Sequence, residues 1–134
     1  WNLVLNAYNA HENRDGVLPE NRYVRIVVRP DADNWSWIRI EDNAGGMDRQ
    51  LLGFFQNSFS LIREACEQEA DILRVVEMIK GEEGAVNRVG LFFTAIAVND
   101  MHGKLEVNST PGEGTRFTIG LPATIEGLKG LLQF

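Results

Sequence analysis

The chain has 134 residues, which suits one compact domain large enough to bury a hydrophobic core. Its formal net charge of −6 means that the surface as a whole does not attract nucleic acid, and we expect no nucleic-acid partner. Its apolar runs are far shorter than the ~20 residues of a membrane-spanning helix, so we expect no membrane contact by this chain.

The first ten residues have a helical pattern. Leu3, Val4, Ala7 and Tyr8 recur at the spacing of one apolar helix face, and three asparagines line another face. The following residues, 11–22, are polar and rich in turn formers, so we expect a loop with His11 at the surface.

Two β-strands are expected next. Residues 23–29 and 35–41 are rich in β-branched and aromatic side chains, and a polar turn at 30–34 separates them. This pattern predicts an antiparallel hairpin. The second strand runs into a sharp break at residues 42–47, Asp-Asn-Ala-Gly-Gly-Met.

Apolar residues then recur at helical spacing over residues 60–80, which predicts one helix of about five turns. The chain's one cysteine, Cys66, lies in this run, so we expect a packed thiol rather than a reactive one. A single cysteine also excludes an internal disulfide framework and suits a reducing compartment, hence a cytoplasmic location. We expect three phenylalanines upstream to lie in the core: Phe54, Phe55 and Phe59.

The C-terminal third predicts a helix over residues 91–101 and two strands at 104–108 and 115–121, after a flexible link at 81–84. Residues 109–114 form the turn between the strands, and the tail at 123–134 has a short amphipathic helical pattern. His102 beside Gly103 is expected in a surface turn. The fold class is therefore α+β, with a mostly antiparallel sheet covered on one face by helices.

Two segments carry oxygen-rich side chains. Asn2, Asn6 and Asn9 share one helix face, where carboxamide oxygens suit magnesium, although they also suit a solvated surface. Asp42 ends a strand before small residues, so its carboxylate could accept a hydrogen bond from an exocyclic amine such as that of adenine. An ordinary turn is the alternative interpretation.

Two further segments suit a nucleotide. Gly90 enters a helix, whose free N–H groups bind phosphate well. Residues 111–115, Pro-Gly-Glu-Gly-Thr, deliver the hydroxyl of Thr115 onto a strand, although a plain hairpin turn has the same pattern.

Together these four segments resemble the GHKL ATPases, and most closely the catalytic domain of sensor histidine kinases. Residues 2–9 resemble the N box (NLLxNA), residues 41–47 the G1 box (DxGxG) and residues 88–91 the G2 box (GxGL). Residues 97–122 resemble the end of a histidine-kinase catalytic domain. The resemblance implies a Bergerat-type two-layer α/β sandwich with a mostly antiparallel, mixed sheet.

The resemblance also implies roles for individual residues. Asn6 would bind magnesium, Asp42 would bind the adenine amino group, and Thr115 would assist through an ordered water. Gly46 would allow close approach to the base and sugar, and Gly90 close approach to the phosphates. We also assign four further positions of these boxes to the nucleotide site: Asn9, Ala44, Arg88 and Leu91.

Three positions differ from the family pattern in informative ways. Asn2 stands where many family ATPases carry a glutamate base, and because an amide cannot accept that proton, phosphoryl transfer is favoured over fast hydrolysis. Asn9 stands near a position that is often basic in kinases. Ala44 and Arg88 replace the first glycines of G1 and G2, and Arg88 either contacts a phosphate or obstructs the loop.

The resemblance implies that the chain binds ATP with Mg²⁺ and transfers the γ-phosphoryl group to a histidine in two-component signalling. Its partners would be a phosphoacceptor helical domain and, downstream, a response regulator. We expect residues 1–134 to be one catalytic domain without the family's first strand or the phosphoacceptor domain. The alternatives are a degenerate nucleotide-binding module that acts by binding a partner, and a GHKL serine kinase or ATPase of another branch.

Overall fold

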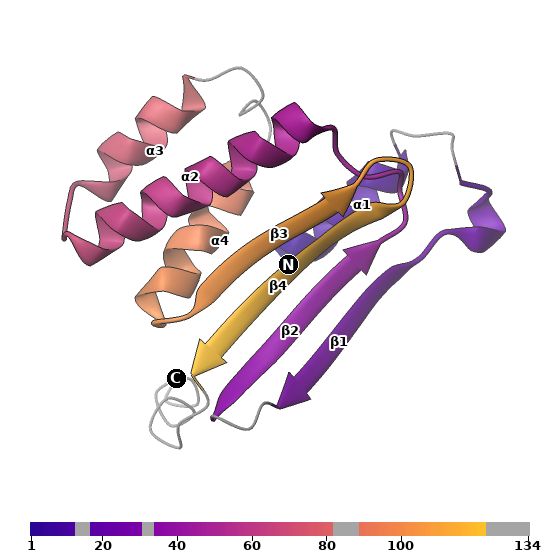
Figure 1. The fold of residues 1–134 in the computed structure, drawn as a ribbon, viewed down its shortest axis with the longest axis horizontal. Helices are drawn as coiled ribbons and strands as arrows, with labels where there is room; N and C mark the ends of the chain where they lie inside the picture. The colour runs from indigo at the N-terminus through magenta and orange to yellow at the C-terminus, as the bar shows by residue number, and fades with distance from the viewer. Residues whose placement is uncertain (13–16, 31–33, 82–88, 123–134) are drawn as a thin grey trace.

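The computed structural model describes residues 1–12, 17–30, 34–81 and 89–122. Arg88, most of the predicted link at 81–84 and the predicted tail helix at 123–134 lie outside these residues. Within the described part, four strands form one antiparallel sheet in the order β1-β2-β4-β3 (Figure 1). The strands are β1 (Val24–Pro30), β2 (Trp35–Asp42), β3 (Lys104–Thr110) and β4 (Gly114–Pro122).

Both predicted hairpins are confirmed. Strand β1 pairs with β2 from Val24 opposite Asp42 to Pro30 opposite Ser36. Strand β4 then pairs with both β2 and β3, so the two hairpins join at the centre of the sheet. This register brings the end of β2, where the G1-like segment begins, directly beside the start of β4.

The helices are α1 (Asn2–Glu12), α2 (Arg49–Glu67), α3 (Ile72–Lys80) and α4 (Val89–Asp100), with a short 3₁₀ turn, η1, at Pro19–Asn21. Helix α1 packs against β2, and α2 packs against both α4 and β3. The core lies between these helices and one face of the sheet, and Phe55, Phe92 and Phe117 are its largest fully buried side chains. None of the helices in the described part of the chain is long and apolar enough to cross a membrane.

The prediction of one helix over residues 60–80 is wrong. Helix α2 begins earlier, at the cap Asp48, whose side chain accepts a hydrogen bond from the Leu51 N–H. It ends at Glu67, and α3 starts after a second aspartate cap, Asp71, which accepts from the Arg74 N–H. The apolar pattern continues across the break because both helices bury a face against the same core, and periodicity alone does not detect the interruption.

Two predictions for the first helix are also wrong. His11 is only 8% exposed and belongs to the last turn of α1, not to a surface loop. Its Nε2 lies 3.0 Å from the carbonyl oxygen of Tyr23, which only accepts, so Nε2 carries the proton and donates. Tyr8 is 57% exposed, because the buried stripe of α1 runs through Leu3 and Ala7 to His11.

Other burial predictions are confirmed. Phe55 and Phe59 are buried and Phe54 packs against the same core. Cys66 is half-buried beside that core, and burial raises the pKa of its thiol. His102 is exposed in the turn before β3, with a positive φ of 57°.

Candidate nucleotide site

The centre of the candidate site is a pair of buried polar residues on adjacent strands. Asp42, the last residue of β2, lies opposite Thr115 near the start of β4. Their exposed fractions are 6% and 7%. The Asp42 Oδ1 accepts a hydrogen bond from the Ala44 N–H at 3.0 Å, which fixes the carboxylate and shapes the turn that follows it. A held, buried carboxylate next to a hydroxyl is suited to recognise a polar ring edge.

Ser109 connects the hairpin β3–β4 to the G1-like segment. Its Oγ accepts from the Met47 N–H at 2.7 Å and donates to the Gly114 carbonyl oxygen at 3.0 Å. It also lies 3.0 Å from the Thr115 Oγ1. Since the one Ser109 proton goes to Gly114, the hydroxyl of Thr115 donates to Ser109 and keeps its own lone pairs for a water or a ligand donor.

Gly46 lies against the β3–β4 turn. Its φ is +72°, and a Cβ at this position would collide with the carbonyl oxygen of Thr110. Next to it, the Gly112 N–H donates to the Gly45 carbonyl oxygen at 2.8 Å. A glycine is therefore needed at position 46 for contact with the protein's own turn, and this contact, together with the Gly45 carbonyl, holds the segment after β2 in place.

The N-box-like and G2-like segments meet directly. The Asn2 Nδ2 donates to the Gly90 carbonyl oxygen at 3.1 Å and lies 3.4 Å from the Thr94 Oγ1. The Thr94 hydroxyl in turn donates to the same Gly90 carbonyl at 2.8 Å. A Cβ at Gly90 would come within 3.1 Å of the Asn2 side chain, so the absence of a side chain here lets α1 and the start of α4 approach each other.

The remaining predicted residues have different environments. Asn6 is half-buried and Asn9 exposed on the same face of α1 as Asn2. Ala44 is buried, and the Leu91 side chain is 3% exposed and belongs to the core, so only the backbone of Leu91 is able to meet a phosphate. Arg88 lies outside the described residues.

The donor set fits magnesium that arrives with a nucleotide. In the described part of the chain, no group of three or more His, Cys, Asp and Glu side chains is arranged to hold a metal ion. A lone amide ligand such as Asn6 is compatible with Mg²⁺, which usually takes one or two protein ligands and completes its octahedron with phosphate oxygens and waters.

A hollow of about 270 Å³ lies at this end of the sheet. Asp42 and Thr115 line this hollow together with outward-facing strand residues such as Glu41 and Arg116. No residue of α1 lines it, so the hollow does not include the predicted magnesium ligand Asn6. A second hollow of about 280 Å³ lies between α2, α4 and β3 and touches none of the predicted site residues. We therefore define the candidate site by its hydrogen bonds and not by these hollows.

The structure thus brings the predicted residues together in two groups. One joins Asp42, Ala44, Gly46 and Thr115, and the other joins Asn2 with Gly90. Sequence reasoning missed Ser109 and Thr94, which complete these groups. Two patterns in the sequence could have indicated them. The register of the predicted hairpin sets Ser109 opposite Thr115, and Thr94 follows Gly90 by four residues, the spacing of one helical turn.

Comparison with protein families identifies the class of this domain. The family model of histidine kinase-, DNA gyrase B- and HSP90-like ATPases matches residues 1–125. The chain therefore belongs to this family, the GHKL ATPases, and is an ATP-binding domain of the ATPase and kinase type. No curated protein matches the chain closely.

Proposed function

We propose that this domain transfers the γ-phosphoryl group of Mg-ATP to a histidine on a separate helical domain, in two-component signalling. The observation that carries the proposal is the state of Asn2. Its amide is neutral and already donates to Gly90, and it has no basic group that would take a proton from a water molecule. An amide instead of a base at this position favours positioning of the phosphoryl group over hydrolysis.

The chain's own residues would supply recognition and positioning. Asp42, held by the Ala44 N–H, would accept from the adenine amino group, and Thr115 would hold a water beside it. Asn6 would contribute an amide oxygen to the magnesium, which neutralises phosphate charge when it is bound. The backbone at the start of α4, held by Asn2 and Thr94, would present N–H groups to the phosphates.

The direct test is a phosphotransfer assay. The chain is mixed with Mg²⁺, γ-labelled ATP and a histidine-bearing helical domain, taken from its own parent protein or from a related kinase. We expect label on the helical domain that is lost in acid and stable in alkali, as a phosphohistidine is. Rapid release of inorganic phosphate, or acid-stable label on a serine, would instead assign the chain to another branch of the family.

The role of Asn6 is tested by nucleotide affinity. The variant Asn6→Ala should weaken binding of Mg-ATP and leave magnesium-free ADP affinity nearly unchanged, because the amide serves the metal. Asn57→Ala, the same change at an exposed position of α2 outside the predicted site, is the matched control. Equal losses of both ligands in Asn6→Ala would mean that Asn6 acts through the helix and not through the metal.

A further inference from the structure

The sheet face that points away from the core has a regular arrangement of side chains. Because residues alternate along a strand, the neighbours of the buried Ile40, Val107 and Phe117 all point to this outer face. The cross-strand register arranges them in three rows, which run from β1 across β2 and β4 to β3. The rows are Arg25-Glu41-Arg116-Asn108, Val27-Arg39-Thr118-Glu106 and Arg29-Trp37-Gly120-Lys104.

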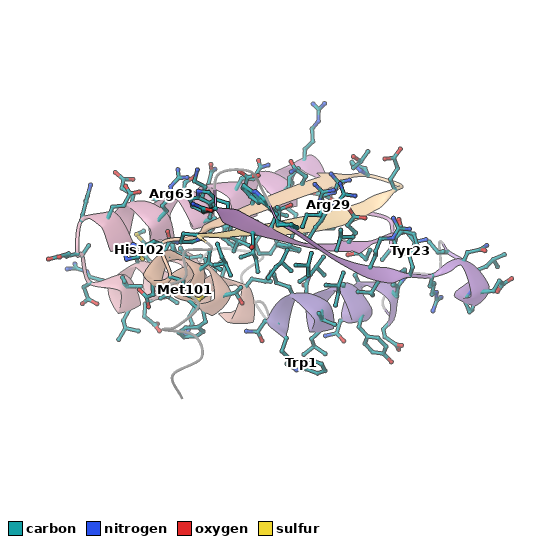
Figure 2. The ribbon with its side chains drawn as sticks, turned by 90° about the horizontal axis from the view of Figure 1, so that it is seen from below. Trp1, Tyr23, Arg29, Arg63, Met101 and His102 are labelled. Atoms are coloured by element: carbon teal, nitrogen blue, oxygen red, sulfur yellow. The ribbon has the colours of Figure 1, made fainter. Side chains whose placement is uncertain are left out.

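This outer face is basic although the chain is acidic. Its rows contain five cations and two carboxylates, whereas the whole chain has a formal charge of −6. Half of the ten lysines and arginines in the described residues lie here. Figure 2 shows Arg29 on one side of the sheet and Trp1, the residue before α1, on the other side. The charge of this face is thus opposite in sign to that of the protein as a whole.

One carboxylate on the outer face is surrounded by three arginines. Glu41 lies 3.1 Å from Arg116, 3.6 Å from Arg25 and 3.8 Å from Arg39. The Glu41 side chain is only 14% exposed, but the three arginine side chains are 39–59% exposed. A single carboxylate neutralises one of these charges, so Glu41 orders the guanidinium groups and leaves their other donors facing outward.

The aromatic side chains of this face are already packed. The rings of Trp35 and Trp37 stack with centroids 6.2 Å apart, and the Trp37 ring leaves no room for a side chain at Gly120. The Lys104 ammonium lies 5.2 Å from the Trp35 ring, and the Arg25 guanidinium 4.7 Å from the Tyr23 ring. These rings offer edges and small apolar surfaces, whereas a single-stranded nucleic acid needs open ring faces for its bases.

We propose that the outer face of the sheet, defined by the three rows above together with Trp35, is a docking surface for an acidic segment of a partner protein. Arginine, tryptophan and tyrosine are the residues most enriched at the energetic centres of protein interfaces. Here the guanidinium groups would bind Asp and Glu carboxylates, and the Trp35–Trp37 pair would contact an apolar side chain between them. The side chains of the predicted Asp42–Thr115 adenine contact point to the other face of the sheet. The two regions meet only at the end of the sheet, where Glu41, Arg116 and Asn108 line the same hollow as Asp42 and Thr115.

The test uses the whole chain without nucleotide and three labelled probes: a peptide of alternating Glu and Val, the same peptide with Gln for Glu, and a single-stranded oligonucleotide. Fluorescence anisotropy should show binding of the Glu peptide that weakens as salt is raised, and little binding of the Gln peptide. The double variant Arg29→Glu with Arg39→Glu should lower the affinity for the Glu peptide by about tenfold or more, the loss typical of reversing charges at an interface.

The matched control is Arg74→Glu, which reverses an exposed charge on α3. It should change the peptide affinity by less than about twofold, since it lies away from the docking surface. Unchanged thermal unfolding of all variants shows that folding is retained. The proposal is overturned if the double variant binds the Glu peptide like the original chain, if Arg74→Glu weakens it equally, or if the oligonucleotide binds the outer face more tightly than the peptide.

Discussion

The side-chain amide of Asn2 donates a hydrogen bond to the carbonyl oxygen of Gly90, 3.1 Å away, and so joins the first helix of the chain to the start of α4. The two residues are in such close contact that a Cβ on Gly90 would lie 3.1 Å from both the Cγ and the Oδ1 of Asn2. The segments that resemble the N box and the G2 box are therefore one physical unit, and a change in either should act on the predicted phosphate end of the site.

The first prediction is that Gly90→Ala changes nucleotide binding more than stability. Alanine is favoured over glycine in a helix by about 0.8–1 kcal/mol. The displaced Asn2 side chain loses a hydrogen bond worth about 0.5–1.5 kcal/mol. The two effects oppose each other, so urea unfolding should shift by less than about 1 kcal/mol. Calorimetry should nevertheless show weaker ATP binding, because the start of α4 is no longer held by Asn2.

The control for this variant is Gly53→Ala in α2. No atom lies within 4 Å of a Cβ at Gly53, so only the helix preference acts. We expect a gain in unfolding free energy of about 0.5–1 kcal/mol and unchanged ATP affinity. If Gly90→Ala stabilises the chain as much as Gly53→Ala does, the Asn2 contact contributes nothing.

The second prediction concerns Asp42→Asn. An asparagine Oδ1 still accepts from the Ala44 N–H, so the turn should persist and unfolding should shift by less than about 1 kcal/mol. The acceptor oxygen that would face adenine is replaced by an amide donor, which should weaken ATP binding by about 1–3 kcal/mol. Titration calorimetry that gives the same ATP affinity for both proteins would remove Asp42 from the site.

The strands and their pairing were predictable because alternation and turn residues are local signals. In the second half of β2 the buried Ile40 and Asp42 alternate with the outward-facing Arg39 and Glu41, and the hairpin partner of this strand lies only a few residues away. The errors lie where a helix cap or a contact between separate segments decides the structure. The break between α2 and α3 depends on the Asp71 cap, and the burial of His11 depends on the carbonyl of Tyr23, twelve residues away.

The candidate site was predictable as a set of residues but not as an arrangement. The motifs indicated Asp42 and Thr115, but only the sheet register places them opposite each other. The docking surface had no signal along the chain, because its cations are single residues on four strands and form no run of charge. The arrangement of the candidate site and of the docking surface is therefore set by contacts between distant segments, which composition and spacing do not reveal.

The third prediction is that Cys66 is an unreactive thiol. Burial raises its pKa above the ordinary value, and the carboxylates of Asp100 and Glu67 raise it further. Less thiolate is present at a given pH, and the thiolate is the form that reacts. Iodoacetamide at pH 8 should therefore modify Cys66 more slowly in the folded chain than in urea. Asp100→Asn should speed the reaction of the folded chain, and an unchanged rate would mean that exposure alone controls it.

The last prediction separates two reasons for a glycine at Gly46. Both Gly46 and Gly112 have a positive φ, +72° and +82°, so alanine is strained at either position by about 1 kcal/mol. At Gly112 no atom lies within 4 Å of an added Cβ, but at Gly46 the Cβ would collide with the backbone of Thr110. Backbone atoms of a paired strand do not move aside as a flexible side chain does.

We therefore expect Gly112→Ala to lower the free energy of unfolding by about 1 kcal/mol and Gly46→Ala by roughly 2–4 kcal/mol, as in other cases of strain with overpacking. Urea unfolding of both variants measures the difference. Gly46→Ala should also weaken ATP binding, because the collision separates the segment after β2 from the β3–β4 turn, which leads into Gly114 and Thr115. Equal destabilisation of the two variants would show that position 46 needs glycine only for its positive φ and not for the close contact with Thr110. In that case the contact with Thr110 does not hold the adenine end of the site.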